Sequence, residues 1–115
     1  MFESLELLVG QKVDDLDTIK QHLEKFQYTH VKNVLVEGEY SQRGGVLDIY
    51  PANFDSPVRI DFDNDQIRSI ASLNTVTNKP IWQHKIVLIL PYKLRKRTFF
   101  TSDLPIDYFV DMLLT

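Results

Sequence analysis

The sequence contains no cysteine, which excludes a disulfide framework and a cysteine-ligated zinc site. A reducing cytoplasm is therefore the compartment that we expect. Long hydrophobic runs are also missing, since no apolar stretch approaches the ~20 residues of a membrane-spanning helix, and the start "MFESLELLVG" does not have the pattern of a signal peptide. The sequence has no excess of positive charge: 13 Lys and Arg against 16 Asp and Glu give a net charge of −3. This balance argues against a dedicated nucleic-acid-binding domain.

The motifs of common enzyme classes are absent as well. No glycine-rich loop ends in Lys-Ser or Lys-Thr, so there is no Walker-type phosphate cradle, and there is no G-x-S-x-G nucleophile motif. Asp61, Asp63 and Asp65 match the first acidic positions of a calcium-binding loop, but Gln66 and Ser72 occupy the positions where that loop requires glycine and glutamate. The three histidines are scattered and have no metal-ligand spacing. The sequence thus predicts a non-enzymatic domain without metal or cofactor.

The 115 residues suit a single domain with a buried core, because 43% are hydrophobic and 25% are charged. The apolar run from Leu5 to Val9, closed by a glycine, predicts a strand. A capping residue, Asp14 or Asp15, then precedes an apolar stripe with helical spacing, formed by Leu16, Ile19, Leu23 and Phe26. This stripe predicts an amphipathic helix.

Alternating and β-branched residues then predict a meander of strands. Its members are residues 31–37, "VLDIY", "VRIDF" and "QIRSIASL", with "EGEYSQRGG" around the first reversal and "DND" at the last turn. The final strand does not keep a period of two, so it is bulged, short or covered on both faces. "NTVTNKPIWQH" is loop-like, "KIVLILP" is typical of a central strand, and a helix is predicted from Asp103 onward. These elements predict an α+β fold of two layers, in which helices pack on a mixed, largely antiparallel sheet.

Two arginines in this meander raise the question of function. Arg43 lies beside the Gly-Gly turn, and the alternation of "VRIDF" places Arg59 on the solvent face. Both could form a small cationic surface for carboxylates of a partner, because guanidinium groups pair with carboxylates in bidentate geometry. The alternative is local ion pairing, of Arg43 with Glu37 or Glu39 and of Arg59 with Asp61 or Asp48, which stabilises little at an exposed site.

A basic segment late in the chain is the best candidate for contact with nucleic acid. It contains Lys93, Arg95, Lys96 and Arg97, with aromatic residues nearby at positions 92, 99 and 100. Basic side chains neutralise phosphates, and aromatic rings stack on bases. A solvated linker is the competing interpretation, because so short a segment makes few phosphate contacts.

Several stretches together resemble the UvrB-like amino-terminal part of the bacterial transcription-repair coupling factor family. "QYTHV", "GEYSQRGGVLDIYP", "PVRIDF", "DNDQIRSI" and "TNK" follow one another in the order and at the spacing of that family. The resemblance covers roughly Leu7 to Pro91. The long second motif is the specific one, since its order of Gly, acid, aromatic, Arg-Gly-Gly, Asp and Pro is hard to meet by chance.

The resemblance implies a non-catalytic module of nucleotide excision repair that binds UvrA, the damage-recognition ATPase, and lies beside the family's translocase motor. It also implies that residues 1–115 are a single UvrB-interaction-type domain from a larger multidomain protein. The partner-binding residues that it implies are Arg43, Arg59 and position 63, where the family has an aromatic residue and this chain has Asp63. Further departures from the family pattern are Ala71, Leu73, Asn74 and Lys79.

Overall fold

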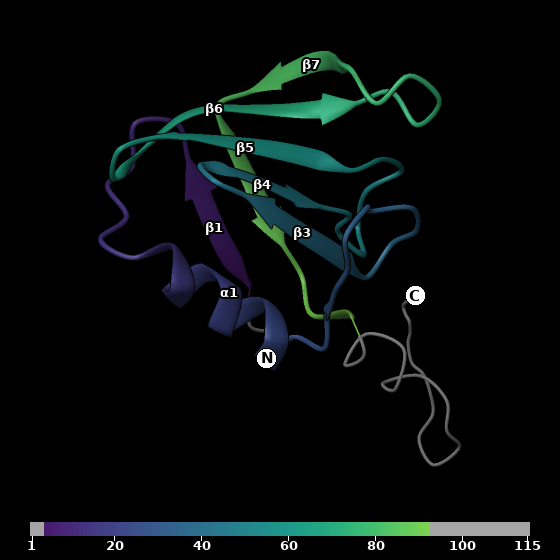
Figure 1. The fold of residues 1–115 in the computed structure, drawn as a ribbon, viewed down its shortest axis with the longest axis horizontal. Helices are drawn as coiled ribbons and strands as arrows, with labels where there is room; N and C mark the ends of the chain where they lie inside the picture. Colours follow the sequence, from purple (N-terminus) through teal and green to yellow (C-terminus); the bar gives the residue numbers. More distant parts are fainter. Residues whose placement is uncertain (1–3, 93–115) are drawn as a thin grey trace.

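The computed structural model describes residues 4–92, which form one helix and eight strands (Figure 1). Their bounds are β1 Leu5–Leu8, α1 Leu16–Lys25, β2 Thr29–His30, β3 Glu39–Arg43, β4 Val46–Ile49, β5 Val58–Asp63, β6 Gln66–Leu73, β7 Pro80–His84 and β8 Ile86–Ile89. Strands β2 to β7 form a six-stranded sheet in sequence order, and β1 pairs with β8 in a separate two-stranded sheet. Only the β2–β3 pair is parallel among these strands, which confirms the predicted α+β fold with a mixed, largely antiparallel sheet.

Helix α1 begins where its sequence predicts. Asp15 is the N-cap, and its side chain accepts a hydrogen bond from the backbone N–H of Asp17 at 3.0 Å. Ile19, Leu23 and Phe26 of the apolar stripe are buried, because they face the sheet. The stripe therefore fixes which side of the helix the sheet covers. The predicted helix after Asp103 lies outside the described residues.

The molecule has two layers. Alternation along the strands sends one set of side chains into the core, where they meet α1 and the β1–β8 ribbon; this set includes Tyr40, Leu47, Ile49, Val58, Ile60 and Ile70. The opposite side of β3, β4 and β5, which we call the outer face, carries Ser41, Arg43, Asp48, Arg59 and Asp61. No helix covers the outer face within the described part of the chain (Figure 1). None of the described helical residues forms a helix long and apolar enough to cross a membrane.

The predicted strand at residues 31–37 is wrong, because residues 31–38 form a loop. Glu39 Oε1 accepts hydrogen bonds from the backbone N–H groups of Leu35 at 2.8 Å and Val36 at 3.1 Å. These local bonds compete with a strand ladder, and Gly38 has a φ of 90°, which suits a turn. The strand is instead β3, which the sequence analysis assigns to the turn, and Arg43 pairs directly with Val46 across a two-residue Gly-Gly turn.

Two expectations about the last strands are also wrong. Residues 80–84, read as loop, form β7 at the edge of the large sheet. The apolar run that predicts a central strand forms β8, which pairs with β1 alone among the described strands. The open question about β6 is answered by two register shifts along its pairings and by the burial of its last four residues, so it is bulged and covered.

Candidate protein-interaction surface

A bidentate ion pair lies at the centre of the outer face. Asp48 of β4 and Arg59 of β5 are direct cross-strand partners. Arg59 donates from Nε to Asp48 Oδ1 at 2.9 Å and from Nη2 to Asp48 Oδ2 at 3.0 Å. The side chain of Asp48 is 8% exposed and that of Arg59 is 25% exposed. Arg59 therefore lies on the face that the alternation predicts, and its side chain there is partly covered and paired with Asp48.

The positive charge of Arg59 is stabilised by its contacts. The hydrogen bond from Arg59 to Asp48 raises the pKa of the Arg59 guanidinium above its ordinary value; the charges of Asp48 and Asp61 add to this, and partial burial opposes it. Arg59 therefore stays cationic, but its charge is already matched by a carboxylate. The sequence predicts that Arg59 either faces a partner's carboxylate or pairs locally, and the structure shows it paired locally with Asp48.

Arg43 is in the opposite situation. It is exposed at the end of β3, and it makes no ion pair or side-chain hydrogen bond within residues 4–92. The expected pairing with Glu37 or Glu39 does not occur there; the Glu39 carboxylate is engaged by the backbone of the loop at residues 31–38 instead. Arg43 thus presents an uncompensated cation to anything that meets the outer face.

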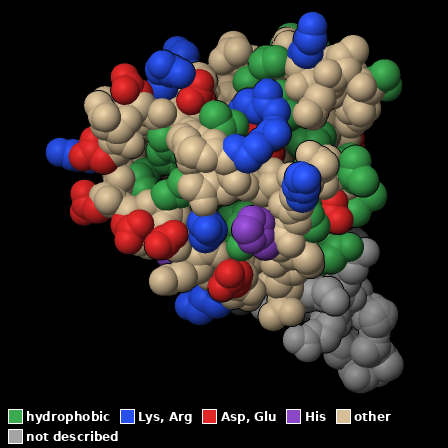
Figure 2. All heavy atoms as spheres, viewed as in Figure 1, with side chains coloured by type: hydrophobic (Ala, Val, Ile, Leu, Met, Phe, Trp, Pro, Cys, Tyr) green, Lys and Arg blue, Asp and Glu red, His purple; other side chains and the backbone are tan. Residues whose placement is uncertain are grey.

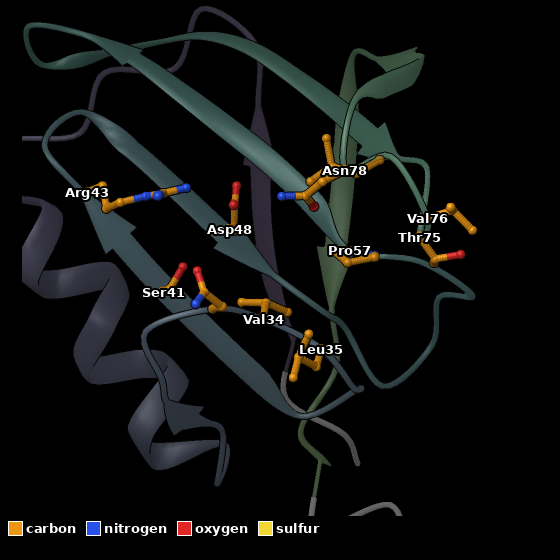
Figure 3. A pocket seen from close by; sticks show the side chains of 11 residues that line it. Val34, Leu35, Ser41, Arg43, Asp48, Pro57, Thr75, Val76 and Asn78 are labelled. Carbon is orange, nitrogen blue, oxygen red and sulfur yellow. The ribbon is translucent and has the colours of Figure 1, made fainter.

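Arg43 lines a hollow of about 340 Å³ on the outer face, which we call the outer-face hollow. Its floor includes Ser41, Arg43 and Asp48 from the sheet, and its walls come from the loop at residues 31–38 and from the β6–β7 turn, with Val34, Leu35, Val76 and Asn78 among the lining residues. Figure 3 shows Arg43 extending along this floor toward the side where Asp48 lies. In Figure 2, Lys and Arg side chains gather near the middle of the face in view.

Asp63 ends β5, and it is exposed. The alternation of β5 puts Asp63 on the same side as Arg59 and Asp61. A second ion pair lies next to it, in which Arg68 Nη2 donates to Asp61 Oδ2 at 2.7 Å. That hydrogen bond raises the pKa of Arg68, and the charges of Asp61 and Asp63 contribute as well. Asp63 is therefore near a cation and is part of the charged end of the outer face.

The strand register gives the spacing of the three residues that the resemblance implicates. Arg43 faces Val46, which in turn faces Asp61, and Asp61 lies two residues from both Arg59 and Asp63. With strands about 4.8 Å apart and about 3.4 Å per residue, the three Cα atoms form a triangle with sides of roughly 12 to 14 Å. One partner surface could touch all three side chains.

Several residues at this site escape sequence reasoning. Leu35 is 78% exposed and Val76 is 89% exposed, on the two walls of the outer-face hollow. The sequence pattern predicts a strand at Leu35 and a loop at Val76, and a single exposed apolar residue in either is ordinary. The available signal was Glu39, whose spacing from Leu35 and Val36 permits a carboxylate to cap their backbone N–H groups.

Lys93, Arg95, Lys96 and Arg97 lie outside the described residues, so nucleic-acid contact by this segment stays a prediction. Among residues 4–92, no group of three or more His, Asp or Glu side chains could hold a metal ion.

Comparison with known proteins agrees with the sequence motifs. Residues 5–94 match the family model described as the UvrB interaction domain. The transcription-repair-coupling factor of Haemophilus influenzae is 33% identical over 94 residues, which is 82% of this chain and 8% of that protein, and the Escherichia coli protein of the same name is 30% identical over 88 residues. UvrABC system protein B of Thermosipho africanus is 31% identical over 108 residues, which is 94% of this chain and 16% of that protein.

The chain thus spans only a small part of the length of these relatives. The motif "GEYSQRGGVLDIYP" occupies β3, its turn and β4, and "PVRIDF" leads into and forms most of β5, so the resembling motifs build the outer face. With a family model that covers most of its residues and relatives that match it along most of its length, this chain belongs to the UvrB interaction domain family.

Proposed function

We propose that this chain is a non-catalytic module that binds a UvrA-like damage-recognition protein through its outer face, in transcription-coupled nucleotide excision repair. The observation that carries the proposal is Arg43, an exposed cation without a partner among residues 4–92, placed in a hollow whose floor comes from the family's long motif. A guanidinium in this position suits a carboxylate of the partner, because the two groups pair in bidentate geometry.

The two arginines have different roles in this proposal. Arg43 is the direct anchor, since it has no competing carboxylate within the described structure. Arg59 is occupied by Asp48 at 2.9 and 3.0 Å, so it shapes and rigidifies the floor on which Arg43 lies. A partner carboxylate near Arg59 would have to share the guanidinium with Asp48, which lowers the gain from that contact.

Asp63 limits which groups of a partner can lie next to it. A carboxylate in place of the family's aromatic residue removes an apolar anchor of the kind that often contributes about 2 kcal/mol or more to an interface. It also adds a negative charge that would repel acidic groups on the partner. The exposed apolar walls at Leu35 and Val76 offer contact area that compensates for the missing aromatic ring.

The test is binding of purified UvrA to wild type and to Arg43→Ala, measured by calorimetry or surface plasmon resonance. Arg43→Ala should weaken binding by about 1–3 kcal/mol, the range for a charge-assisted hydrogen bond, and binding should weaken with added salt. Lys25→Ala is the matched control, because Lys25 is an exposed cation in the last turn of α1. It should bind like wild type.

Thermal unfolding followed by circular dichroism accompanies the binding assay. Arg43→Ala should keep the wild-type midpoint, since an exposed side chain without partners contributes little to stability. If wild type does not bind UvrA, or if Arg43→Ala binds as tightly as wild type, the outer face is not the interaction surface, and the family relationship reports the fold alone.

The place of this module within a longer protein is part of the same proposal. The relatives extend far beyond the aligned region, because this chain covers 8% of the coupling factors and 16% of the UvrB protein named above. We infer that the domain acts as one unit of a multidomain repair protein, in which other units supply any motor activity. The domain alone should show no ATP turnover above background, and turnover abolished by a point substitution in this chain would contradict that inference.

A further inference from the structure

The free edge of the large sheet is a second surface of interest. Strand β7 pairs with β6 along one side, and no described strand pairs with its other side. Four of its five residues are exposed, among them two large apolar side chains, Ile81 at 54% and Trp82 at 68%. An edge strand offers a row of backbone N–H and C=O groups that another extended segment can pair with.

A hollow of about 470 Å³, which we call the edge hollow, opens beside this strand. Phe54, Ser72, Trp82 and His84 are among its lining residues. Ser72 Oγ and His84 Nε2 lie 2.7 Å apart in a hydrogen bond, and the rings of His84 and Phe54 contact each other edge to face with centroids 6.2 Å apart. The hollow is therefore preformed, and it could receive an apolar side chain that packs on Trp82.

Charge tells what kind of strand the edge can accept. Strand β7 contains no Asp, Glu, Lys or Arg, and it is flanked by two exposed lysines, Lys79 and Lys85. In an antiparallel pairing of two copies centred on Trp82, Lys79 of one copy would lie opposite Lys85 of the other. Like charges directly opposite each other destabilise a strand pair, so the edge is protected against a second copy.

We propose that the β7 edge accepts an extended segment of another protein by strand addition, with an apolar side chain against Trp82 and acidic side chains facing Lys79 and Lys85. The two lysines are six residues apart, so the carboxylates of the segment are six positions apart with the apolar residue midway. Ile81 has no partner in the β6–β7 register, because Ser72 pairs with Trp82 and Leu73 with Pro80, and Pro80 has no N–H to donate. We therefore expect the backbone ladder with the segment to run from Trp82 to Lys85, while Lys79 meets its glutamate through the side chains alone. The edge hollow adjoins the outer-face hollow, since Leu73 and Thr75 line both, but Lys79, Trp82 and Lys85 do not line the outer-face hollow.

Single-stranded nucleic acid is the main competing occupant, because exposed Trp rings stack on bases and lysines contact phosphates. Asp55 lies in the edge hollow and is exposed. Its carboxylate would repel a phosphate backbone that passes over Trp82, whereas it leaves a strand with an apolar residue at that point unaffected. The edge thus favours a polypeptide.

A synthetic peptide tests the proposal directly. The probe is a fluorescein-labelled peptide of about nine residues, with an isoleucine at the centre, a glutamate three positions to each side, and valine or threonine elsewhere. Its palindromic pattern makes it independent of strand direction. Binding is followed by anisotropy, and independently by the emission of Trp82, which is the sole tryptophan of the chain and should shift to the blue as its ring leaves water.

The variants then locate the site. Trp82→Ala should weaken peptide binding by about tenfold or more, because aromatic anchors dominate such interfaces. The double change Lys79→Glu and Lys85→Glu should weaken it by about two- to tenfold at low salt, and replacing both glutamates of the peptide with lysine should restore binding to that double variant. Val76→Ala and Arg43→Ala should bind the peptide like wild type, since neither residue belongs to the edge.

Self-association gives a second and independent measurement. The single variant Lys79→Glu places opposite charges across the pairing of two copies and should form dimers in light scattering at low salt, whereas wild type and the double variant should not. Unchanged peptide binding in Trp82→Ala, or tighter binding of oligo-dT than of the peptide, would overturn the proposal. Loss of UvrA binding in Arg43→Ala with intact peptide binding would separate this surface from the outer face.

Discussion

The Asp48–Arg59 pair makes a quantitative prediction about stability. Arg59→Leu removes two charge-assisted hydrogen bonds and leaves Asp48, whose side chain is 8% exposed, without its cation. Breaking a fully buried ion pair costs about 3–5 kcal/mol, but the 25% exposure of Arg59 lets water reach the gap. We therefore expect a loss of about 2 kcal/mol, which lowers the melting temperature of a domain of this size by about 8–16 °C.

The assay is thermal and urea unfolding followed by circular dichroism, with a double variant as the decisive comparison. Asp48→Val combined with Arg59→Leu removes the orphaned carboxylate as well, and apolar cross-strand pairs stabilise sheets, so the double variant should recover about 1 kcal/mol or more. Arg68→Leu is the matched control, because its ion pair at 2.7 Å has a more exposed arginine, at 61%, and should matter little. Equal midpoints for Arg59→Leu and wild type, or a double variant less stable than the single one, would refute this reasoning.

The pH dependence of that loss follows from the direction of the pKa shift. The pKa of Arg59 is raised in the folded state, principally by its hydrogen bond to Asp48. A raised basic pKa contributes stability that is present below the unfolded-state value and is lost only as pH rises through the folded-state value. Arginine titrates far above neutrality, so the difference between Arg59→Leu and wild type that arises from this group should stay constant between about pH 6 and pH 9.

Three further substitutions have expected outcomes. Asp63→Phe should strengthen UvrA binding by about tenfold or more by restoring the family's aromatic anchor, and an unchanged dissociation constant in calorimetry would mean that the partner does not reach this position. Gly38→Ala should be strongly destabilising in urea unfolding, because φ is 90° and the added Cβ would lie 3.0 Å from three ring atoms of Tyr92; a wild-type midpoint would show that the loop relaxes freely. Asp15→Ala should cost about 1 kcal/mol by removing the N-cap bond to Asp17, while Asp15→Asn should retain most of the stability, and equal losses would point to charge in place of capping.

Helix α1, β4 and β5 could be predicted because each element's local signals agree with its tertiary environment. The Asp15 cap and the apolar stripe of α1 both point to one buried face, and the alternation of "VRIDF" matches a strand with one wet side. The loop at residues 31–38 could not be predicted from propensity, because β-branched residues there are overruled by the carboxylate of Glu39 and by the left-handed Gly38. The strand forms directly after this loop, as β3, whose residues alternate between the core and the outer face.

The candidate site, too, could be predicted only in part. The sequence places Arg59 in the right strand and on the right face, since a period of two is enough for that inference, whereas it places Arg43 in the turn that β3 in fact precedes. It does not distinguish the paired arginine from the free one, because that depends on which residues lie opposite across two strand registers. Trp82 escapes notice for a related reason: whether an aromatic residue in a short strand is buried or exposed depends on whether another strand follows beyond it.

The charges of the outer face also bear on how the chain finds its register during folding. A slip of one residue between β4 and β5 reverses the faces of the strand that moves. For β5, Arg59 and Asp61 would then enter the core in place of Ile60, beside Leu23 and Leu47. Each unpaired charge in that environment costs several kcal/mol, a sum comparable to the whole stability of a small domain. Misaligned hairpins are therefore disfavoured before the core closes, and the charged residues of the outer face also protect the chain from misfolding.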